Sequence, residues 1–217
     1  MAGIHHDWGT APYLELHALQ QRLVVARAEN RIPKVLLTGE HPQVITLGRK
    51  TPDDEAYDDR FHVVKVERGG EATYHGPGQI VAYPIVHLTQ SRKDLHRFQR
   101  DLEEIGIRTL AEFGIEGSRR EGLTGVWIGL RKVQSLGIAV RRWVTWHGLA
   151  LNVATDLEPF RTFNPCGLDG QVMISMAEAL GPGSVDLAAV KARLVAHASE
   201  ILPGGPYETG DLPDLAD

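Results

Sequence analysis

Apolar residues recur along the chain with two different spacings, and the spacing separates expected helices from expected strands. In residues 10–29 and 91–114 they return every three or four positions, which is typical of amphipathic helices. A further helix is expected after the capping residue Asp186. Shorter apolar or alternating runs, typical of strands, cover residues 35–37, 44–47, 62–66, 80–86, 125–128, 132–140 and 144–153.

The order of these segments indicates the fold class. The strands are joined mainly by short turns and the helices come before and after them, which predicts an α+β fold with a mixed, largely antiparallel sheet flanked by helices. A P-loop and a GxGxxG helix entry are both absent. We expect a single domain over residues 1–202, with loosely held residues 1–8, and a flexible tail over residues 203–217, which are rich in glycine, proline and aspartate.

Composition narrows the class of protein. The 217 residues carry a formal net charge of −5, which disfavours bulk attraction to nucleic acid or to an anionic membrane. The single cysteine, Cys166, excludes an intramolecular disulfide and a multi-cysteine metal site. No apolar run approaches the roughly 20 residues of a membrane span, and the N-terminus lacks a signal-peptide core. We therefore expect a cytoplasmic protein.

The most unusual stretch is the glycine-rich sequence RGGEATYHGPGQ at residues 68–79. It connects two expected strands, and its glycines let the backbone approach a ligand closely and expose its N–H groups. A glycine-rich hairpin without any chemistry remains the alternative, because such runs are weak motifs on their own.

Cys166 and Lys132 are the candidate catalytic pair. Cys166 lies in an irregular Asn-Pro-Cys-Gly turn, where a thiolate can be presented to a pocket, although a lone cysteine is more often a small buried residue. Lys132 follows a turn and becomes a base if it is partly buried; otherwise it is a solvated surface charge. His75 and His147 are alternative bases. No histidine pair has ligand spacing on a helix, so no catalytic metal is expected.

Several segments, taken in order, resemble the lipoyl(octanoyl) transferase family over most of the chain up to residue 202. The matching segments are EHPQVITLGR at 40–49, RGGEATYHGPGQ at 68–79, YP at 83–84, KVQSLG at 132–137, Arg142, HG at 147–148, LNV at 151–153, DL at 156–157, Phe160 and NPCG at 164–167.

The resemblance implies the fold of the biotin and lipoate protein ligase catalytic domain. It implies transfer of an octanoyl or lipoyl group from acyl carrier protein to a lysine of a lipoyl domain, which is the first step of endogenous lipoate synthesis. Acceptors in such a family are the E2 subunits of 2-oxoacid dehydrogenases and the glycine-cleavage H protein. Cys166 would form the acyl thioester and Lys132 would transfer protons. No cofactor and no ATP are implied, and a monomer is expected.

The acyl group would be bound by the glycine loop and the neighbouring strands. Tyr74, Gly76 and Gly78 are expected to line the site, Arg68 to support the loop, and backbone N–H groups or His75 to hold the carbonyl oxygen. The full set of expected binding residues is Arg68, Gly69, Gly70, Thr73, Tyr74, His75, Gly76, Gly78, Gln79, Ser135, Leu136, Gly137, Ile138, His147, Gly148, Leu149, Ala150 and Asn152.

Acyl carrier protein and lipoyl domains are usually acidic, so a basic docking face is also expected. Its candidates are Arg92, Lys93, Arg97, Arg100, Arg141 and Arg142.

Three other functions stay open at this point. An ATP-dependent lipoate or biotin ligase would need no Cys166 and would bind an acyl-adenylate. A cysteine hydrolase would release free octanoate without an acceptor. A non-catalytic module would bind lipoyl domains and form no acyl-enzyme; the presence of both Lys132 and Cys166 argues against it.

Overall fold

Two β-sheets and the helices that cover them make up the fold in the computed structural model, which describes residues 2–53, 57–89, 93–163, 169–181 and 183–215. The large sheet has the strand order β11-β1-β2-β6-β10-β9-β8-β7, and the small sheet has the order β4-β3-β5. The strands are β1 Gly3–Thr10, β2 Val35–Glu40, β3 Val44–Leu47, β4 His62–Lys65, β5 Thr73–His75, β6 Gln79–Ile85, β7 Ser118–Arg120, β8 Leu123–Ile128, β9 Arg131–Arg141, β10 Val144–Asn152 and β11 Tyr207–Thr209. The α-helices are α1 Tyr13–Ala28, α2 Leu95–Glu112, α3 Met176–Leu180 and α4 Leu187–Ile201, and short 3₁₀ turns lie at η2 Glu158–Thr162 and η4 Gly170–Val172.

The large sheet is mixed. Its strand β1 runs parallel to both β2 and β11, whereas the pairs from β2 through β6, β10, β9 and β8 to β7 are antiparallel. In the small sheet β3 is parallel to β4 and antiparallel to β5. The α+β class with a mixed, largely antiparallel sheet is therefore confirmed.

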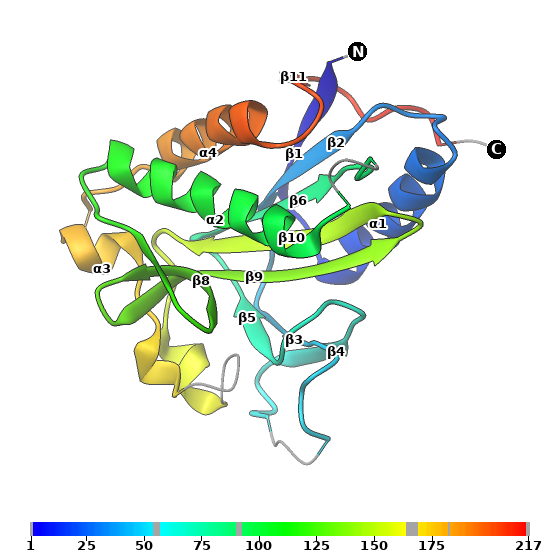
Figure 1. The fold of residues 1–217 in the computed structure, drawn as a ribbon. Coiled ribbons are helices and arrows are strands. Elements are labelled where there is room, and N and C mark those ends of the chain that lie inside the picture. The colour runs from blue at the N-terminus through cyan, green and yellow to red at the C-terminus, as the bar shows by residue number, and fades with distance from the viewer. Residues whose placement is uncertain (1, 54–56, 90–92, 164–168, 182, 216–217) are drawn as a thin grey trace.

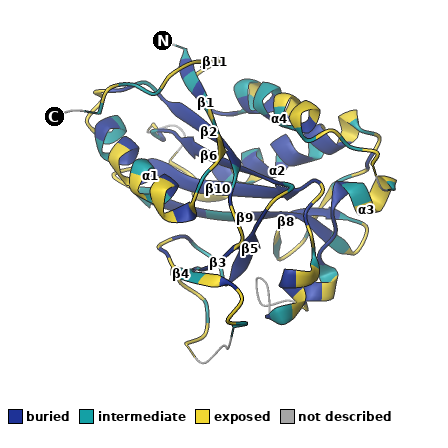
Figure 2. Ribbon diagram, turned by 180° about the vertical axis from the view of Figure 1, so that it is seen from behind, coloured by how far each residue is buried: buried dark blue, intermediate teal, exposed yellow. Residues whose placement is uncertain are grey.

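Helices cover both faces of the large sheet (Figure 1). Along β6, Ile80 and Ala82 pack into the core that α2 and α4 close, whereas Val81 and Tyr83 pack on the opposite face, which α1 covers. This alternation follows from the two-residue period of a strand. Figure 2 shows the result: the central strands are buried, and the helices expose only their outer sides.

Helix starts are set by short polar side chains or by proline. Asp94 accepts a hydrogen bond from the Arg97 N–H at the start of α2, and Asp186 accepts one from the Ala188 N–H at the start of α4. Pro12 occupies the N-cap position of α1, which has no side-chain cap. Within the described ranges, no helix has the length and apolar character that crossing a bilayer requires.

Both ends of the described chain differ from the expectation of loose segments. Residues 3–10 form β1, and residues 207–209 of the expected flexible tail form β11, which pairs with β1 from Gly3 to His5. The reason is that each segment satisfies its backbone groups on a strand that is distant in sequence, a contact with no local sequence signal. The glycine-rich stretch at 68–79 also contains a strand of its own, β5, rather than being one open connection.

Candidate active site

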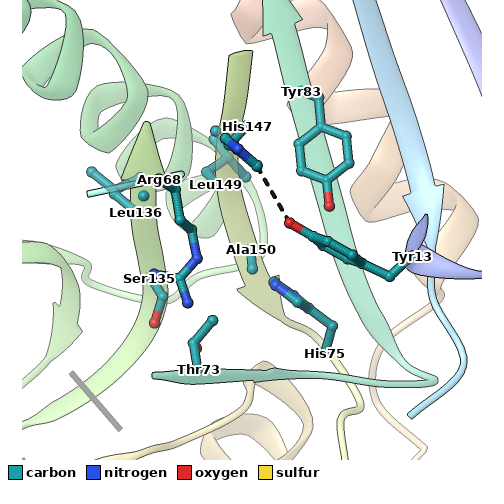
Figure 3. A pocket seen from close by; sticks show the side chains of 12 residues that line it. Tyr13, Arg68, Thr73, His75, Tyr83, Ser135, Leu136, His147, Leu149 and Ala150 are labelled. Carbon is teal, nitrogen blue, oxygen red and sulfur yellow. Dashed lines mark hydrogen bonds between the residues drawn. The ribbon is translucent and has the colours of Figure 1, made fainter. Parts of the chain in front are cut away.

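A cavity lies where β9 and β10 of the large sheet face β5 of the small sheet (Figure 3). Its lining consists of Tyr13, Arg68, Thr73, His75, Tyr83, Ser135, Leu136, Gly137, His147, Gly148, Leu149 and Ala150. All of these except Tyr13 and Tyr83 are expected binding residues, although they come from three separate stretches of sequence. The fold therefore brings most of the expected site into one cavity.

Tyr13 and Tyr83 are the lining residues that the sequence reasoning missed. Tyr83 lies in the Tyr83-Pro84 pair of the family pattern, which was a usable signal. Tyr13 is the first residue of α1, and only the packing of that helix against the sheet brings it to the cavity. Their hydroxyl groups lie close to histidines: Tyr83 Oη is 2.9 Å from His41 Nε2, and Tyr13 Oη is 3.3 Å from His147 Nδ1. Burial raises the pKa of both tyrosines, so both hydroxyls stay protonated.

Arg68 holds the glycine-rich loop in place, as expected. Its guanidinium is buried and donates to the Thr46 carbonyl at 2.6 Å, the Thr46 hydroxyl at 2.9 Å and the Glu71 carbonyl at 2.7 Å. Gly137 leaves room for this side chain, because a Cβ there would lie 2.7 Å from Arg68 Cδ. The loop is thus tied both to the small sheet and to β9.

A chain of buried hydrogen bonds fixes the orientation of His75. Asn152 Nδ2 donates to the Ile174 carbonyl at 3.2 Å, which leaves Asn152 Oδ1 as the acceptor for Gln79 Nε2 at 2.9 Å. Gln79 Nε2 also donates to the Tyr74 carbonyl at 3.1 Å, so Gln79 Oε1 must accept from His75 Nδ1 at 2.7 Å. Because the two backbone carbonyls can only accept hydrogen bonds, the donor and the acceptor of every hydrogen bond in this network are fixed.

His75 is therefore a neutral imidazole with its hydrogen on Nδ1 and a lone pair on Nε2. Burial, followed by the nearby His41, lowers the pKa of His75 to about 3, although the Gln79 hydrogen bond opposes the shift. A lone pair accepts hydrogen bonds and cannot hold a carbonyl oxygen. This tautomer does not fit the expected role of His75 in holding that oxygen, because such a role needs a donor.

Lys132 is buried rather than solvated. Its side chain leaves β9 next to Gly125 of β8, and it is only 4% exposed. A Cβ on Gly125 would lie 2.7 Å from Lys132 Cε and 3.5 Å from Nζ, so the absence of a side chain at Gly125 gives the lysine its space. Nζ lies 5.8 Å from the centre of the Trp127 ring. Lys132 lines a second cavity, and Leu136 lines this cavity as well as the first, so the two adjoin.

The chain that follows the Asn-Pro-Cys-Gly element is fastened to Lys132. Met173 pairs with Lys132 in an isolated parallel bridge, and the Ile174 N–H donates to the Lys132 carbonyl at 3.0 Å. The predicted nucleophile Cys166 itself lies outside the described residues, as do its neighbours from 164 to 168.

Tyr74, Gly76 and Gly78 differ from expectation, because none of them lines the cavity. Thr73 and His75 of β5 face the cavity, so Tyr74 between them points the other way and packs edge-on against Phe160 at 5.4 Å between ring centres. A Cβ on Gly76 would collide with the Tyr74 hydroxyl, and Gly78, with φ of 80°, approaches the Ala154 backbone too closely for a side chain.

The other expected residues support the site from behind. Gln79 and Asn152 orient His75, and the Gly69 N–H donates to the Ile138 carbonyl at 2.9 Å, which attaches the loop to β9. Gly70 lines the Lys132 cavity.

Part of the expected basic face comes together. Lys93, just before α2, places its Nζ 5.0 Å from the centre of the Trp143 ring. Trp143 and Arg142 form the turn after Arg141, the last residue of β9. Arg92 lies outside the described residues, and Arg100 is paired with Glu103 at 2.8 Å. The docking role of these residues stays a prediction.

Comparison with known proteins gives one consistent result. Residues 12–199 match the model of the lipoyl protein ligase A/B catalytic domain. An octanoyltransferase of Syntrophotalea carbinolica is 46% identical over 196 residues, covering 90% of this chain and 92% of that protein. An octanoyltransferase of Gloeobacter violaceus is 49% identical over 163 residues, covering 74% and 73% of the two chains.

Solved structures with the same fold include ligases. A lipoate-protein ligase A bound with ATP superposes with a TM-score of 0.74 at 16% identity, covering 97% of this chain and 90% of the other. A biotin protein ligase from Aquifex aeolicus, in complex with biotin and ATP, gives 0.56 at 14% identity, covering 91% and 68%. At these identities the likeness concerns the fold alone, whereas the sequence matches decide the family. The chain is an acyltransferase and belongs to the octanoyltransferases within the lipoyl protein ligase A/B catalytic-domain family.

Proposed function

We propose that the chain transfers an octanoyl group from octanoyl-acyl carrier protein to one lysine of a lipoyl domain through a thioester on Cys166. The observation that carries this proposal is the buried Lys132 amine, in a cavity that adjoins the cavity of the glycine-rich loop. An isolated structural lysine is rarely buried. A lysine that serves as the base for a nucleophile needs to be buried in a cavity in this way.

The reaction divides into two exchanges. Lys132 accepts the proton of the Cys166 thiol, the thiolate attacks the octanoyl carbonyl, and the bond from that carbonyl to the donor sulfur breaks. The departing thiol takes its proton from Lys132. The acceptor lysine then attacks the Cys166 thioester and loses a proton to Lys132. An amide forms, and Cys166 is released as a thiol.

The acyl chain would lie in the cavity of the glycine-rich loop. Leu136, Leu149 and Ala150 supply apolar wall. The carbonyl oxygen would be held by backbone N–H groups of the loop, because His75 presents a lone pair at Nε2. Arg68 keeps the loop backbone in position.

Partners and conditions follow from the same reaction. The acceptors would be lipoyl domains of E2 subunits and the glycine-cleavage H protein, docking on the basic residues around Lys93 and Arg142. Exchange between two thioesters is nearly thermoneutral and the amide is more stable, so ATP is not required. We place the enzyme in the cytoplasm as a monomer, and its single cysteine fits a reducing compartment.

The test is intact-protein mass spectrometry after incubation with octanoyl-acyl carrier protein. Wild type should gain one octanoyl group, removable by hydroxylamine and mapped to Cys166, and Cys166→Ser should gain no thioester. Lys132→Met should form the adduct about 100-fold or more slowly. Transfer to a lipoyl domain without an adduct would overturn the thioester, and a requirement for ATP would favour the ligase chemistry. Release of free octanoate without an acceptor would favour a hydrolase.

A further inference from the structure

Three side chains from distant parts of the sequence meet beside the cavity. His17 comes from α1, Glu67 from the segment after β4, and His147 from β10. One nitrogen or carboxylate oxygen of each lies within 4.8 Å of those of the other two. His17 Nε2 and Glu67 Oε2 are already 2.9 Å apart. No local sequence pattern indicates this cluster, because its three members lie on separate segments of the chain.

His147 has an unusual backbone for its position. By the alternation of a strand it should share a face with Leu149 and Leu151, which pack under α2 and α4. Its φ is instead 54°, and its ring stacks on Trp146 at 4.4 Å, near the rings of α1. A residue other than glycine with left-handed backbone dihedral angles costs about 1–3 kcal/mol of conformational energy. Such residues are typical of functional positions. The backbone is thus bent to bring this imidazole to His17.

His147 also carries a buried nitrogen without a hydrogen bond. The residue is only 2% exposed, its Nδ1 faces the Tyr13 hydroxyl, and its Nε2 has no hydrogen-bond partner. An unsatisfied buried polar atom costs about 1–3 kcal/mol, so a ligand at Nε2 would remove a real penalty.

We propose that His17, Glu67 and His147 bind a divalent transition-metal ion of the Zn²⁺ class. Two imidazoles and one carboxylate are a donor set that Zn²⁺ accepts, with one coordination position left for water. The Tyr13 hydroxyl would accept the Nδ1 hydrogen of His147 and fix the ring, as outer-shell partners do.

The exposure of the cluster suits an ion that arrives from solvent. The Glu67 side chain is 51% exposed and that of His17 is 16% exposed, so the two outer ligands can close on the ion while His147 stays fixed. The Arg68 guanidinium is near enough to act on His147 electrostatically, and it opposes a second cation. The affinity should therefore be below that of a closed structural zinc site.

Metal binding would interfere with acyl transfer, and this second part rests on the proposed function. His147 and Arg68 line the cavity of the glycine-rich loop, and Glu67 is the residue before Arg68. An ion bound to His147 would fix the position of this side chain in the cavity wall. It would thereby compete with binding of the octanoyl donor in the cavity.

Binding is tested by titrating the full chain with Co²⁺, followed by its visible absorption, and then displacing it with Zn²⁺. Wild type should bind one ion, and His17→Gln should bind at least about 10-fold more weakly, because losing a ligand costs more than losing an outer-shell partner. The matched control is His96→Gln, at an exposed histidine of α2, which should bind like wild type. Cys166→Ser should also bind like wild type. Equal binding by His17→Gln, or loss of binding in Cys166→Ser, would overturn the proposed ligands.

The effect on transfer is measured separately. Zn²⁺ should raise the KM for octanoyl-acyl carrier protein in wild type and His96→Gln, and should leave His17→Gln unaffected. If Zn²⁺ still inhibits His17→Gln, the inhibition comes from Zn²⁺ bound to another group. That result would overturn the proposed competition between the metal ion at this site and the octanoyl donor. A failure of the transfer reaction itself would leave the Co²⁺ titration readable, so the two proposals fail independently.

Discussion

His75 Nδ1 lies 2.7 Å from Gln79 Oε1, and the carbonyls of Tyr74 and Ile174 force the hydrogen of this bond onto the histidine. The cavity of the glycine-rich loop therefore contains a neutral imidazole whose Nε2 carries a lone pair. Nitrogen-15 NMR should find the Nδ1–H tautomer of His75 at neutral pH.

Replacing Gln79 with glutamate should raise the pKa of His75. A carboxylate at the place of Oε1 favours the imidazolium, so the pKa should move upward from about 3 toward the usual value. An NMR titration of wild type and Gln79→Glu checks this, with Gln99→Glu on α2 as the control. An unchanged His75 titration in Gln79→Glu would contradict the assigned hydrogen bond.

Gly125→Ala should displace Lys132. The new Cβ would collide with the Gln134 carbonyl oxygen and lie 2.7 Å from Lys132 Cε, and φ at this residue is 119°, so the pairing of β8 with β9 has to shift and the lysine moves with it. We expect the single-turnover rate of acylation to fall more than about tenfold. Gly129→Ala is the matched control, since it has a positive φ of 57° and nothing within 4 Å of the new Cβ. It should cost about 1–2 kcal/mol of stability and keep the rate. Equal rates in both variants would contradict the positioning of Lys132 by Gly125.

Glu103 should be the most costly charge to remove from α2. It is 1% exposed, pairs with Arg100 and Arg119, and accepts the Gly125 N–H at 3.0 Å. Glu103→Ala leaves that buried N–H unpaired, so the free energy of unfolding should fall by about 3 kcal/mol. Arg100→Ala, at an exposed partner, should cost below about 1 kcal/mol. Denaturant unfolding measures both, and similar losses would contradict the burial argument.

Stability should fall in mild acid because of His41. Burial lowers the pKa of this imidazole from 6.5 to about 4. Above pH 6.5 both folded and unfolded chains hold it neutral, and between pH 6.5 and about 4 only the unfolded chain takes up a proton. The contribution of His41 to the free energy of unfolding therefore decreases by about 3 kcal/mol across that window as pH falls, and the buried His75, whose pKa is lowered to about 3, adds to the loss.

The measurement is urea unfolding at a series of pH values for wild type, His41→Asn and His96→Gln. The His41→Asn curve should be shallower, and His96→Gln should follow wild type. Parallel curves for wild type and His41→Asn would show that His41 does not stay neutral in the folded chain.

Local sequence pattern was sufficient for elements whose partners lie nearby in sequence. The helix at Leu95–Glu112 and the antiparallel pair β9 and β10 follow from apolar spacing and short turns. β1 gave no such signal, because its sequence has no regular alternation and its strand exists through pairing with β2 and β11. Contacts between distant segments are set by the whole fold, so a local window does not contain them.

The same distinction applies to the site. The glycine-rich loop and the strand residues 135–137 and 147–148 were predictable as parts of the family pattern, and residues 149–150 were expected as their neighbours on the same strand. Tyr74 was misplaced although its alternation with Thr73 and His75 indicated the opposite face. Tyr13 and His17 were missed, because only the docking of α1 on the sheet brings Tyr13 to the cavity and His17 next to the His147 ring.

The pairing of β1 with β11 also bears on how the chain folds during synthesis. β1 precedes every other described strand and β11 follows them all, yet the two are neighbours in the large sheet. While the ribosome makes the intervening residues, one edge of β1 has open N–H and C=O groups that can pair with another chain. Nascent chains should therefore be most prone to aggregation until residues 207–209 emerge and cover that edge.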